Sequence, residues 1–121
     1  MTLFFNKIFN NNQKRGVKNL YFDSIIDTKR NFFISGKIVG QKYLQKENIL
    51  NNLKQGYTCN IVITDKIEYV SDSFWKGFFN DIFKKYKTKD KVLELFTFDI
   101  NNNKITNDLM ENLEILHKLY N

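Results

Sequence analysis

The sequence predicts an α/β fold in which helices pack on a β-sheet. Short runs of β-branched and aromatic residues alternate with three segments of helical periodicity, and a further apolar run precedes them at the N-terminus. Such alternation is typical of a sheet covered by helices. The chain has 121 residues, of which 42% are hydrophobic and 16% aromatic, so it is large and apolar enough for one domain around one core.

Four runs are predicted to be strands because they are rich in Phe, Ile, Val and Thr, which fit a pleated surface. They are residues 3–9, 19–26, 58–64 and 92–98. The first is expected at a sheet edge and the last two in the centre of the sheet. Asparagine triplets at 10–12 and 101–103 predict turns, because Asn tolerates left-handed backbone geometry.

Three segments are predicted to be helices. The first runs from Ser35 to a terminating Gly56, and the last spans residues 106–119. The second, 73–86, has a wide aromatic stripe at positions 74, 75, 78, 79, 82, 83 and 86. The face expected for the first helix has spacings of four and three and consists of Val39, Tyr43, Lys46, Leu50 and Leu53.

The net charge of +6 is concentrated in the first fifty residues, which contain nine Lys and Arg but only three Asp and Glu. A one-sided basic patch attracts an acidic protein or a phosphate backbone. The other interpretation is a solvated lysine-rich face. The absence of proline and alanine indicates AT-rich codons, which favour lysine and raise the net charge without any nucleic-acid partner. The candidate basic patch comprises Lys14, Arg15, Lys18, Lys37, Lys42 and Lys46.

Residues 70–74, Val-Ser-Asp-Ser-Phe, join an apolar run to the aromatic stripe. Ser71 and Ser73 are preferred N-caps, because their hydroxyl oxygens accept hydrogen bonds from the unpaired amides of a first helical turn. The carboxylate of Asp72 complements the helix dipole. These residues therefore either begin a helix and do no more, or Ser71 or Ser73 is a phosphorylation switch beside Asp72.

The order of elements and this motif resemble the STAS-like domains, relatives of the anti-sigma-factor-antagonist fold. The matching segments are residues 61–65 (IVITD) and 70–74 (VSDSF), with Gly36 and Gly40 at the first helix. The resemblance implies a single-domain sandwich over residues 19–121, with a central mixed sheet, about three helices and an N-terminal extension over 1–18. In anti-sigma antagonists a kinase phosphorylates a serine at the start of this helix, and here Asp72 lies at or beside that position.

Residues for enzymatic chemistry are sparse. His117 and Cys59 are the only residues of their types, which is too few for a typical zinc site, and the five glycines form no phosphate-binding loop. We therefore expect no catalytic residues, no cofactor and no metal site.

Adjacent aromatic pairs predict a contact surface. Neighbouring side chains of a strand point to opposite faces, so one of Phe4 and Phe5 faces away from the core unless another segment covers it. The other interpretation is that a phenylalanine-rich chain builds its core from these rings. The predicted partner surface is formed by Phe4, Phe5, Phe32, Phe33 and Trp75, with Lys29, Arg30 and Lys76 at its rim.

These features predict a non-enzymatic interaction module that regulates or inhibits a partner protein by docking, the partner being a regulatory ATPase or kinase, or a host nuclease. One alternative is a phage-encoded, anti-CRISPR-like inhibitor of an RNA-guided nuclease. A second is a basic nucleic-acid-binding domain using the N-terminal part. The single cysteine and the lack of an apolar run near 18 residues predict a cytoplasmic protein, in a bacterium or in a phage's host, with no membrane partner.

Overall fold

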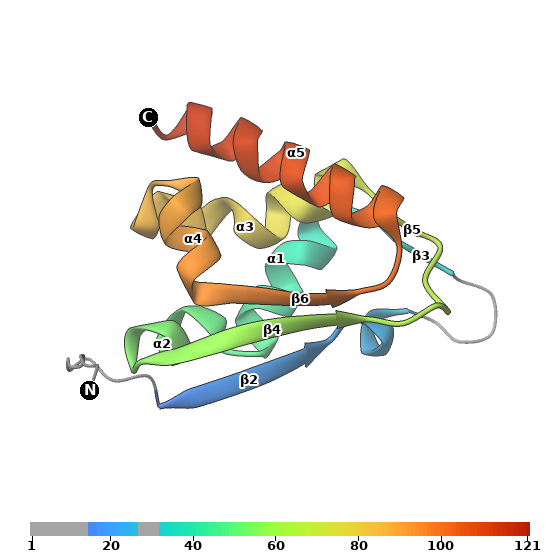
Figure 1. The fold of residues 1–121 in the computed structure, drawn as a ribbon, viewed down its shortest axis with the longest axis horizontal. Helices are drawn as coiled ribbons and strands as arrows, with labels where there is room; N and C mark the ends of the chain where they lie inside the picture. The colour runs from blue at the N-terminus through green and yellow to red at the C-terminus, as the bar shows by residue number, and fades with distance from the viewer. Residues whose placement is uncertain (1–14, 27–31) are drawn as a thin grey trace, which may run out of the picture.

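The computed structural model describes residues 15–26 and 32–121 and has a mixed α/β fold (Figure 1). The predicted strand at 3–9 lies outside the described residues. The elements are β2 (Gly16–Tyr21), the 3-10 helix η1 (Phe22–Ile25), β3 (Phe33–Ile34), α1 (Lys37–Lys46), α2 (Ile49–Lys54), β4 (Tyr57–Ile63), β5 (Tyr69–Val70), α3 (Asp72–Tyr86), α4 (Lys89–Leu95), β6 (Phe96–Ile100) and α5 (Asn103–Leu119).

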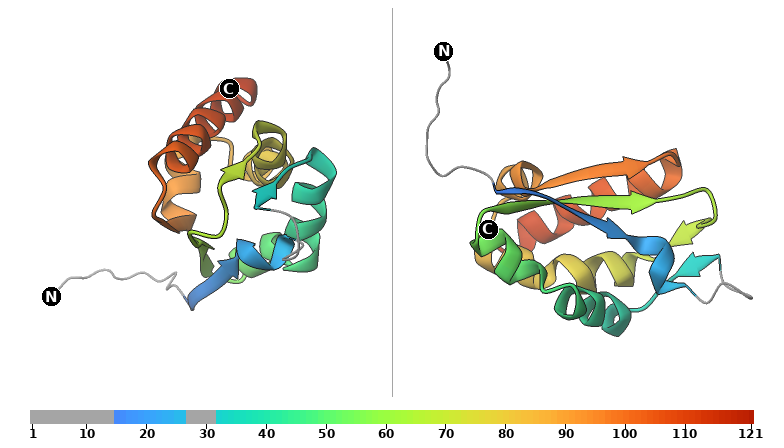
Figure 2. Two further views of the ribbon diagram at one scale, coloured as in Figure 1. Left: turned by 90° about the vertical axis from the view of Figure 1, so that its right-hand side faces the viewer. Right: turned by 90° about the horizontal axis from the view of Figure 1, so that it is seen from below.

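The main sheet has the strand order β2-β4-β6, and both strand pairs are parallel. Each successive strand is added on the same side of the one before it. Right-handed crossovers between such strands therefore place the connecting helices on one face of the sheet. Figures 1 and 2 show this arrangement, with the helices gathered on one side of the sheet. We expected a mixed sheet, which contains at least one antiparallel pair of strands. Among the described strands this expectation is wrong, because every pair is parallel.

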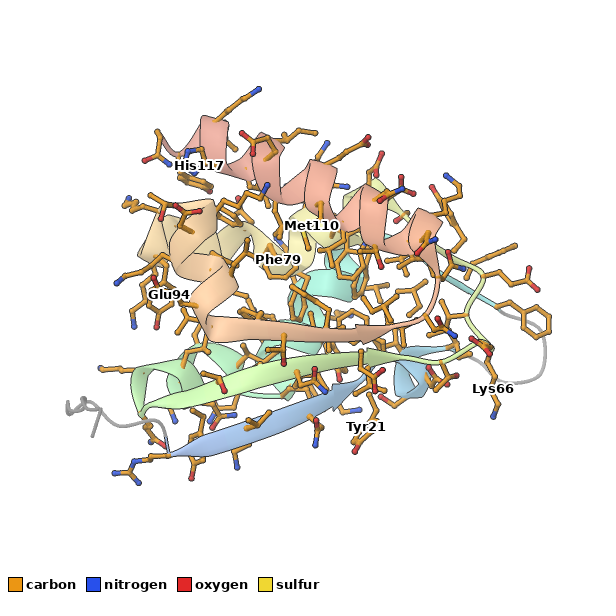
Figure 3. All side chains as sticks on the ribbon, viewed as in Figure 1. Tyr21, Lys66, Phe79, Glu94, Met110 and His117 are labelled. Carbon is orange, nitrogen blue, oxygen red and sulfur yellow. The ribbon has the colours of Figure 1, made fainter. Side chains whose placement is uncertain are left out.

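The two faces of the sheet differ in chemistry. Cys59, Ile61 and Ile63 of β4 point into the core and are buried. On the other face a polar ladder crosses the three strands: the Asn60 amide donates to Asn19 Oδ1 at 3.1 Å, and the Thr97 hydroxyl donates to Asn60 Oδ1 at 2.9 Å. Figure 3 shows Tyr21 pointing away from the helices on this side. A hydrogen-bonded polar face can remain in contact with water, which explains how a parallel sheet is left open on one side.

The second sheet is a pair of two-residue parallel strands, β3 and β5, at the end of the molecule toward which β2 and β4 run (Figure 1). Phe33 pairs with Tyr69, and Ile34 pairs with Val70. Ile34 and Val70 are buried, whereas Phe33 and Tyr69 are exposed. This small sheet therefore anchors on the core through one face and presents aromatic rings on the other.

An aromatic cluster forms the centre of the core. Phe22, directed inward by η1 directly after β2, packs edge-on against Tyr43 of α1 and against Phe74 and Phe78 of α3, with ring centroids 5.2–5.5 Å apart. Edge-to-face ring pairs at such distances stabilise a core beyond their buried area. The stripe on α3 therefore faces the core, where Phe78 and Phe79 pack against Phe96 of β6, and Figure 3 shows Phe79 in this interior.

Several predicted boundaries need correction. The strand expected over 19–26 begins at Gly16 and ends at Tyr21. The single helix expected before Gly56 is two helices, interrupted at Asn48, whose φ of 53° is left-handed. The run at 92–98 is helical through Leu95 and extended only from Phe96, because the Thr88 hydroxyl accepts from the Lys91 amide and begins α4. The last helix begins at Asn103, capped by Asn102.

Candidate protein-docking surface

Ser71 is the N-cap of α3 and does more than cap it. Its Oγ accepts a hydrogen bond from the Phe74 amide at 3.1 Å and a second from the Gly36 amide at 3.2 Å, which is 35 residues away in sequence. The Ser71 amide also donates to the Ile34 carbonyl at 2.9 Å. A single serine thus joins α3 to β3 and to the start of α1.

The other two polar residues of the motif have separate surroundings. Asp72 lies in the first turn of α3, where its Oδ1 accepts from the Asn112 amide of α5 at 2.9 Å. Ser73 is exposed, and its Oγ lies 3.0 Å from Ser71 Oγ. Each of the three residues has a structural partner, and Ser71 has the most.

Two exposed aromatic residues, Phe33 and Tyr69, pair on the small sheet, and a third, Phe32, directly precedes β3. Phe32 is 48% exposed, Phe33 56% and Tyr69 39%. The rings of Phe33 and Tyr69 meet edge-on, with centroids 6.1 Å apart and an interplanar angle of 83°. We call Phe32, Phe33 and Tyr69 the aromatic end. Two further exposed apolar side chains, Ile38 and Val39, follow on the first turn of α1.

Only part of the predicted partner surface is found at the aromatic end. Phe32 and Phe33 lie there, but Trp75 is fully buried against Phe22 and Phe79, so its ring is not available to a partner. Its place in the aromatic stripe of α3 directs it toward the core, and this spacing was the signal against including it in the partner surface. Lys76, beside it on α3, is half-buried. The remaining predicted members, Phe4, Phe5, Lys29 and Arg30, lie outside the described residues.

Tyr69 is the member of this surface that sequence reasoning missed. A signal was present, because Tyr69 and Val70 are adjacent residues of a short strand and must face opposite ways. Val70 is buried, so Tyr69 points outward.

The candidate basic patch is divided between two elements. Arg15 and Lys18 lie at and within β2, and Lys37, Lys42 and Lys46 lie on α1 in the helix layer; all five are exposed. The Lys18 ammonium lies 4.4 Å from the centre of the Tyr57 ring, a cation–π distance. Lys14 lies outside the described residues.

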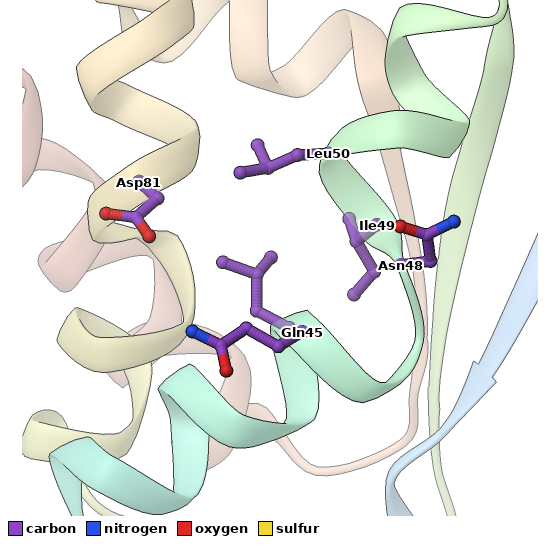
Figure 4. Close-up of a pocket in the computed structure, with 6 residues that line it drawn as sticks. Gln45, Asn48, Ile49, Leu50 and Asp81 are labelled. Carbon is purple, nitrogen blue, oxygen red and sulfur yellow. The ribbon is translucent and has the colours of Figure 1, made fainter.

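A crevice of about 300 Å³ opens between the α1–α2 junction and α3 (Figure 4). Its apolar floor is made by Leu44, Ile49 and Leu50, and Asp81 adds a charged group to its lining. Leu44 and Ile49 are almost fully buried, so the crevice presents little apolar surface to a ligand.

The two residues with potential for nucleophilic chemistry are both engaged in the structure. Cys59 is buried in β4, and burial raises the pKa of its thiol to about 11, which Lys18 partly opposes. His117 Nδ1 accepts a hydrogen bond from the Lys89 amide at 3.0 Å, so it holds the start of α4. Among the residues that the structure describes, no three His, Cys, Asp or Glu side chains are grouped to bind a metal ion.

Comparisons with known proteins found no matching family model, no matching curated protein and no matching solved structure. Within residues 15–26 and 32–121, no helix combines the length and the apolar character needed to span a membrane.

Proposed function

We propose that this chain is a protein-interaction module that docks on a partner protein through the aromatic end and thereby changes the partner's activity. The observation that supports it is the exposure of Phe33 and Tyr69 on a sheet whose opposite face is anchored in the core, with the exposed Phe32 directly before β3. Large exposed rings held on a rigid base are the side chains that contribute most binding energy at protein interfaces.

The charges near the aromatic end favour a protein over a phosphate backbone. Lys37 and Lys66 are close to it along the chain, and so are Asp65 and Glu68; Figure 3 places Lys66 at this end of the molecule. Glu68 is adjacent in space as well, since its amide donates to the Phe32 carbonyl at 2.8 Å. An apolar centre with a rim of both charge signs is typical of a protein interface, whereas a nucleic-acid surface carries one sign.

The test is capture of a partner from host lysate by the tagged full chain, followed by affinity measurement with purified partner. Phe33→Ala and Tyr69→Ala are each expected to weaken binding at least tenfold. Tyr21→Ala is the matched control, because Tyr21 is 57% exposed but lies on the open face of the main sheet. A captured protein that binds Phe33→Ala and the parent chain equally well would refute docking through the aromatic end.

The two alternatives predict different outcomes of the same experiment. A nucleic-acid-binding domain would recover RNA or DNA with an affinity that falls steeply as salt rises, and would weaken on charge reversal of Arg15 and Lys18. An inhibitor of an RNA-guided nuclease would recover the nuclease and protect a plasmid from interference.

We also propose that the fold is related to the STAS-like domains. Two features support this relationship: a capped amphipathic helix follows the predicted strand–turn–serine sequence, and Gly40 of α1 packs closely on that helix. An experimental structure of the full chain, superposed on STAS domains, tests the proposal; a different strand order around β4 would reject it.

A further inference from the structure

We propose that the Ser71 hydroxyl is the positioning group that fixes the aromatic end to α3, so that it controls whether the docking surface is formed. The effect on docking rests on the proposed function, whereas the positioning itself does not and is measured separately.

The segment that carries Phe32 and Phe33 is held by the buried side chain of Ile34 and by a short strand pairing. Its strand, β3, has two residues and pairs only with the equally short β5 in the described structure. Beside that pairing, three hydrogen bonds join residues 32–36 to residues 68–71: Glu68 N to Phe32 O, Ser71 N to Ile34 O, and Gly36 N to Ser71 Oγ. Two of them are backbone bonds, and the third alone depends on a side chain.

The Gly36 amide has a particular need for this acceptor. Gly36 precedes α1, has a φ of 104°, and provides no side-chain cap for the helix. Its amide is one of the donors that a helix start leaves without an intrahelical partner. The Ser71 hydroxyl oxygen has two lone pairs and uses them for Gly36 and Phe74, so it satisfies the starts of α1 and α3 together.

Removing the hydroxyl is therefore expected to loosen the chain on both sides of Gly36. That stretch includes Phe33 of the aromatic end and Ile38 of the first turn of α1. Loss of their fixed placement would raise the ordering cost of binding, because a partner would have to immobilise them again.

The test is hydrogen exchange of the full chain, resolved by residue with NMR. In Ser71→Ala the Gly36 amide and the amides of residues 33–39 are expected to exchange at least tenfold faster than in the parent chain. Ser71→Thr keeps the hydroxyl and should remain within about threefold. Thr88→Ala is the matched control, because Thr88 caps α4 with the same kind of bond but has no bond to β3.

A second variant separates positioning from capping. Glycine is nearly as good an N-cap as serine, so Ser71→Gly removes the hydroxyl while largely sparing α3, and it serves as the test if Ser71→Ala does not fold. Exchange of Gly36 and its neighbours in Ser71→Gly that is no faster than in Thr88→Ala would overturn the proposal.

A binding measurement distinguishes this proposal from the proposed function. With a partner in hand, Ser71→Gly should weaken binding several-fold in the direction of Phe33→Ala. Faster exchange with unchanged binding in both variants would leave the positioning role standing and reject docking through the aromatic end. Unchanged exchange with weaker binding of Phe33→Ala alone would reject the role of Ser71 and keep the docking surface.

Discussion

Gly77 of α3 lies directly against the backbone of Lys37 of α1. A Cβ atom on Gly77 would stand 2.8 Å from the Lys37 carbonyl carbon and 2.9 Å from its Cα. From the other helix, a Cβ on Gly40 would stand 2.5 Å from the Phe74 carbonyl oxygen. The two helices therefore cross with their backbones in contact, which only glycine at both positions permits. This crossing places Tyr43 and Phe78 on the same aromatic cluster around Phe22.

Gly77→Ala is expected to destabilise the protein because no side-chain movement can relieve a clash with backbone atoms. In an unobstructed helix the same change would stabilise by about 1 kcal/mol. Here overpacking should cost about 1–3 kcal/mol or more, measured by urea unfolding. Lys84→Ala, exposed on the same helix, is the control and should change stability by less than about 0.5 kcal/mol. Equal or greater stability of Gly77→Ala would show that the helices do not approach so closely.

The sequence predicts well what depends on local pattern. The aromatic stripe over 74–86 predicts an amphipathic helix, and Ser71 and Ser73 beside it are predicted as N-caps, because these signals lie within one short segment. The run at 92–98 was ambiguous, since a short apolar run fits a helix or a strand equally well. Thr88 gave the deciding signal, a cap ahead of Val92, but it lay outside the run itself.

Contacts between distant segments were beyond sequence reasoning. The bond from Gly36 to Ser71 joins residues 35 apart, and the approach of Gly40 to α3 depends on a crossing that no periodicity encodes. The exposure of the aromatic end has the same origin. In a chain with twelve phenylalanines, composition does not separate buried rings from exposed ones, and only the pairing of β3 with β5 turns Phe33 outward.

Asn48 separates α1 from α2, and its left-handed backbone explains why one expected helix became two. Its φ of 53° and ψ of 41° suit Asn or Gly but strain a β-branched residue. Asn48→Val should therefore destabilise by about 1–2 kcal/mol, whereas Asn48→Gly should be close to neutral. Asn51→Val, exposed inside α2, controls for helix propensity. Thermal unfolding of the three variants checks this, and equal melting temperatures for Asn48→Val and Asn48→Gly would contradict it.

Asn112 on α5 is a buried polar residue whose amide nitrogen has hydrogen-bond partners and whose amide oxygen has none among the described residues. Its Nδ2 donates to Asp72 Oδ1 at 2.9 Å and to the Asp108 carbonyl at 2.8 Å. Asn112→Asp replaces the donor with a carboxylate facing the carboxylate of Asp72. The expected loss is about 3 kcal/mol at pH 7, because a buried charge would be left uncompensated.

The loss in Asn112→Asp should shrink as pH falls, since a protonated carboxyl again donates to Asp72. Asn112→Leu is the control: it removes the unpaired oxygen together with the donor and should stay within about 1 kcal/mol of the parent chain. Urea unfolding at pH 7 and pH 5 measures both. A pH-independent defect in Asn112→Asp would indicate a steric cause instead.

The Cys59 thiol is expected to make the free energy of unfolding fall as pH rises in the alkaline range. Burial raises the pKa of its thiol to about 11, whereas an unfolded chain releases this proton at about 8.5. Because the folded state keeps the proton longer, the stabilisation is fully present below about pH 8.5 and is lost as pH rises toward 11. Cys59→Val has no proton to release, so the difference in unfolding free energy between the parent chain and this variant should fall from pH 8 to pH 10.5. Taking the difference cancels the titration of lysines and tyrosines, which both chains share.

Thiol reagents should correspondingly label Cys59 of the native protein only at the rate of unfolding. Parallel stability curves together with rapid labelling at pH 8 would mean that Cys59 is accessible to solvent and not part of the core.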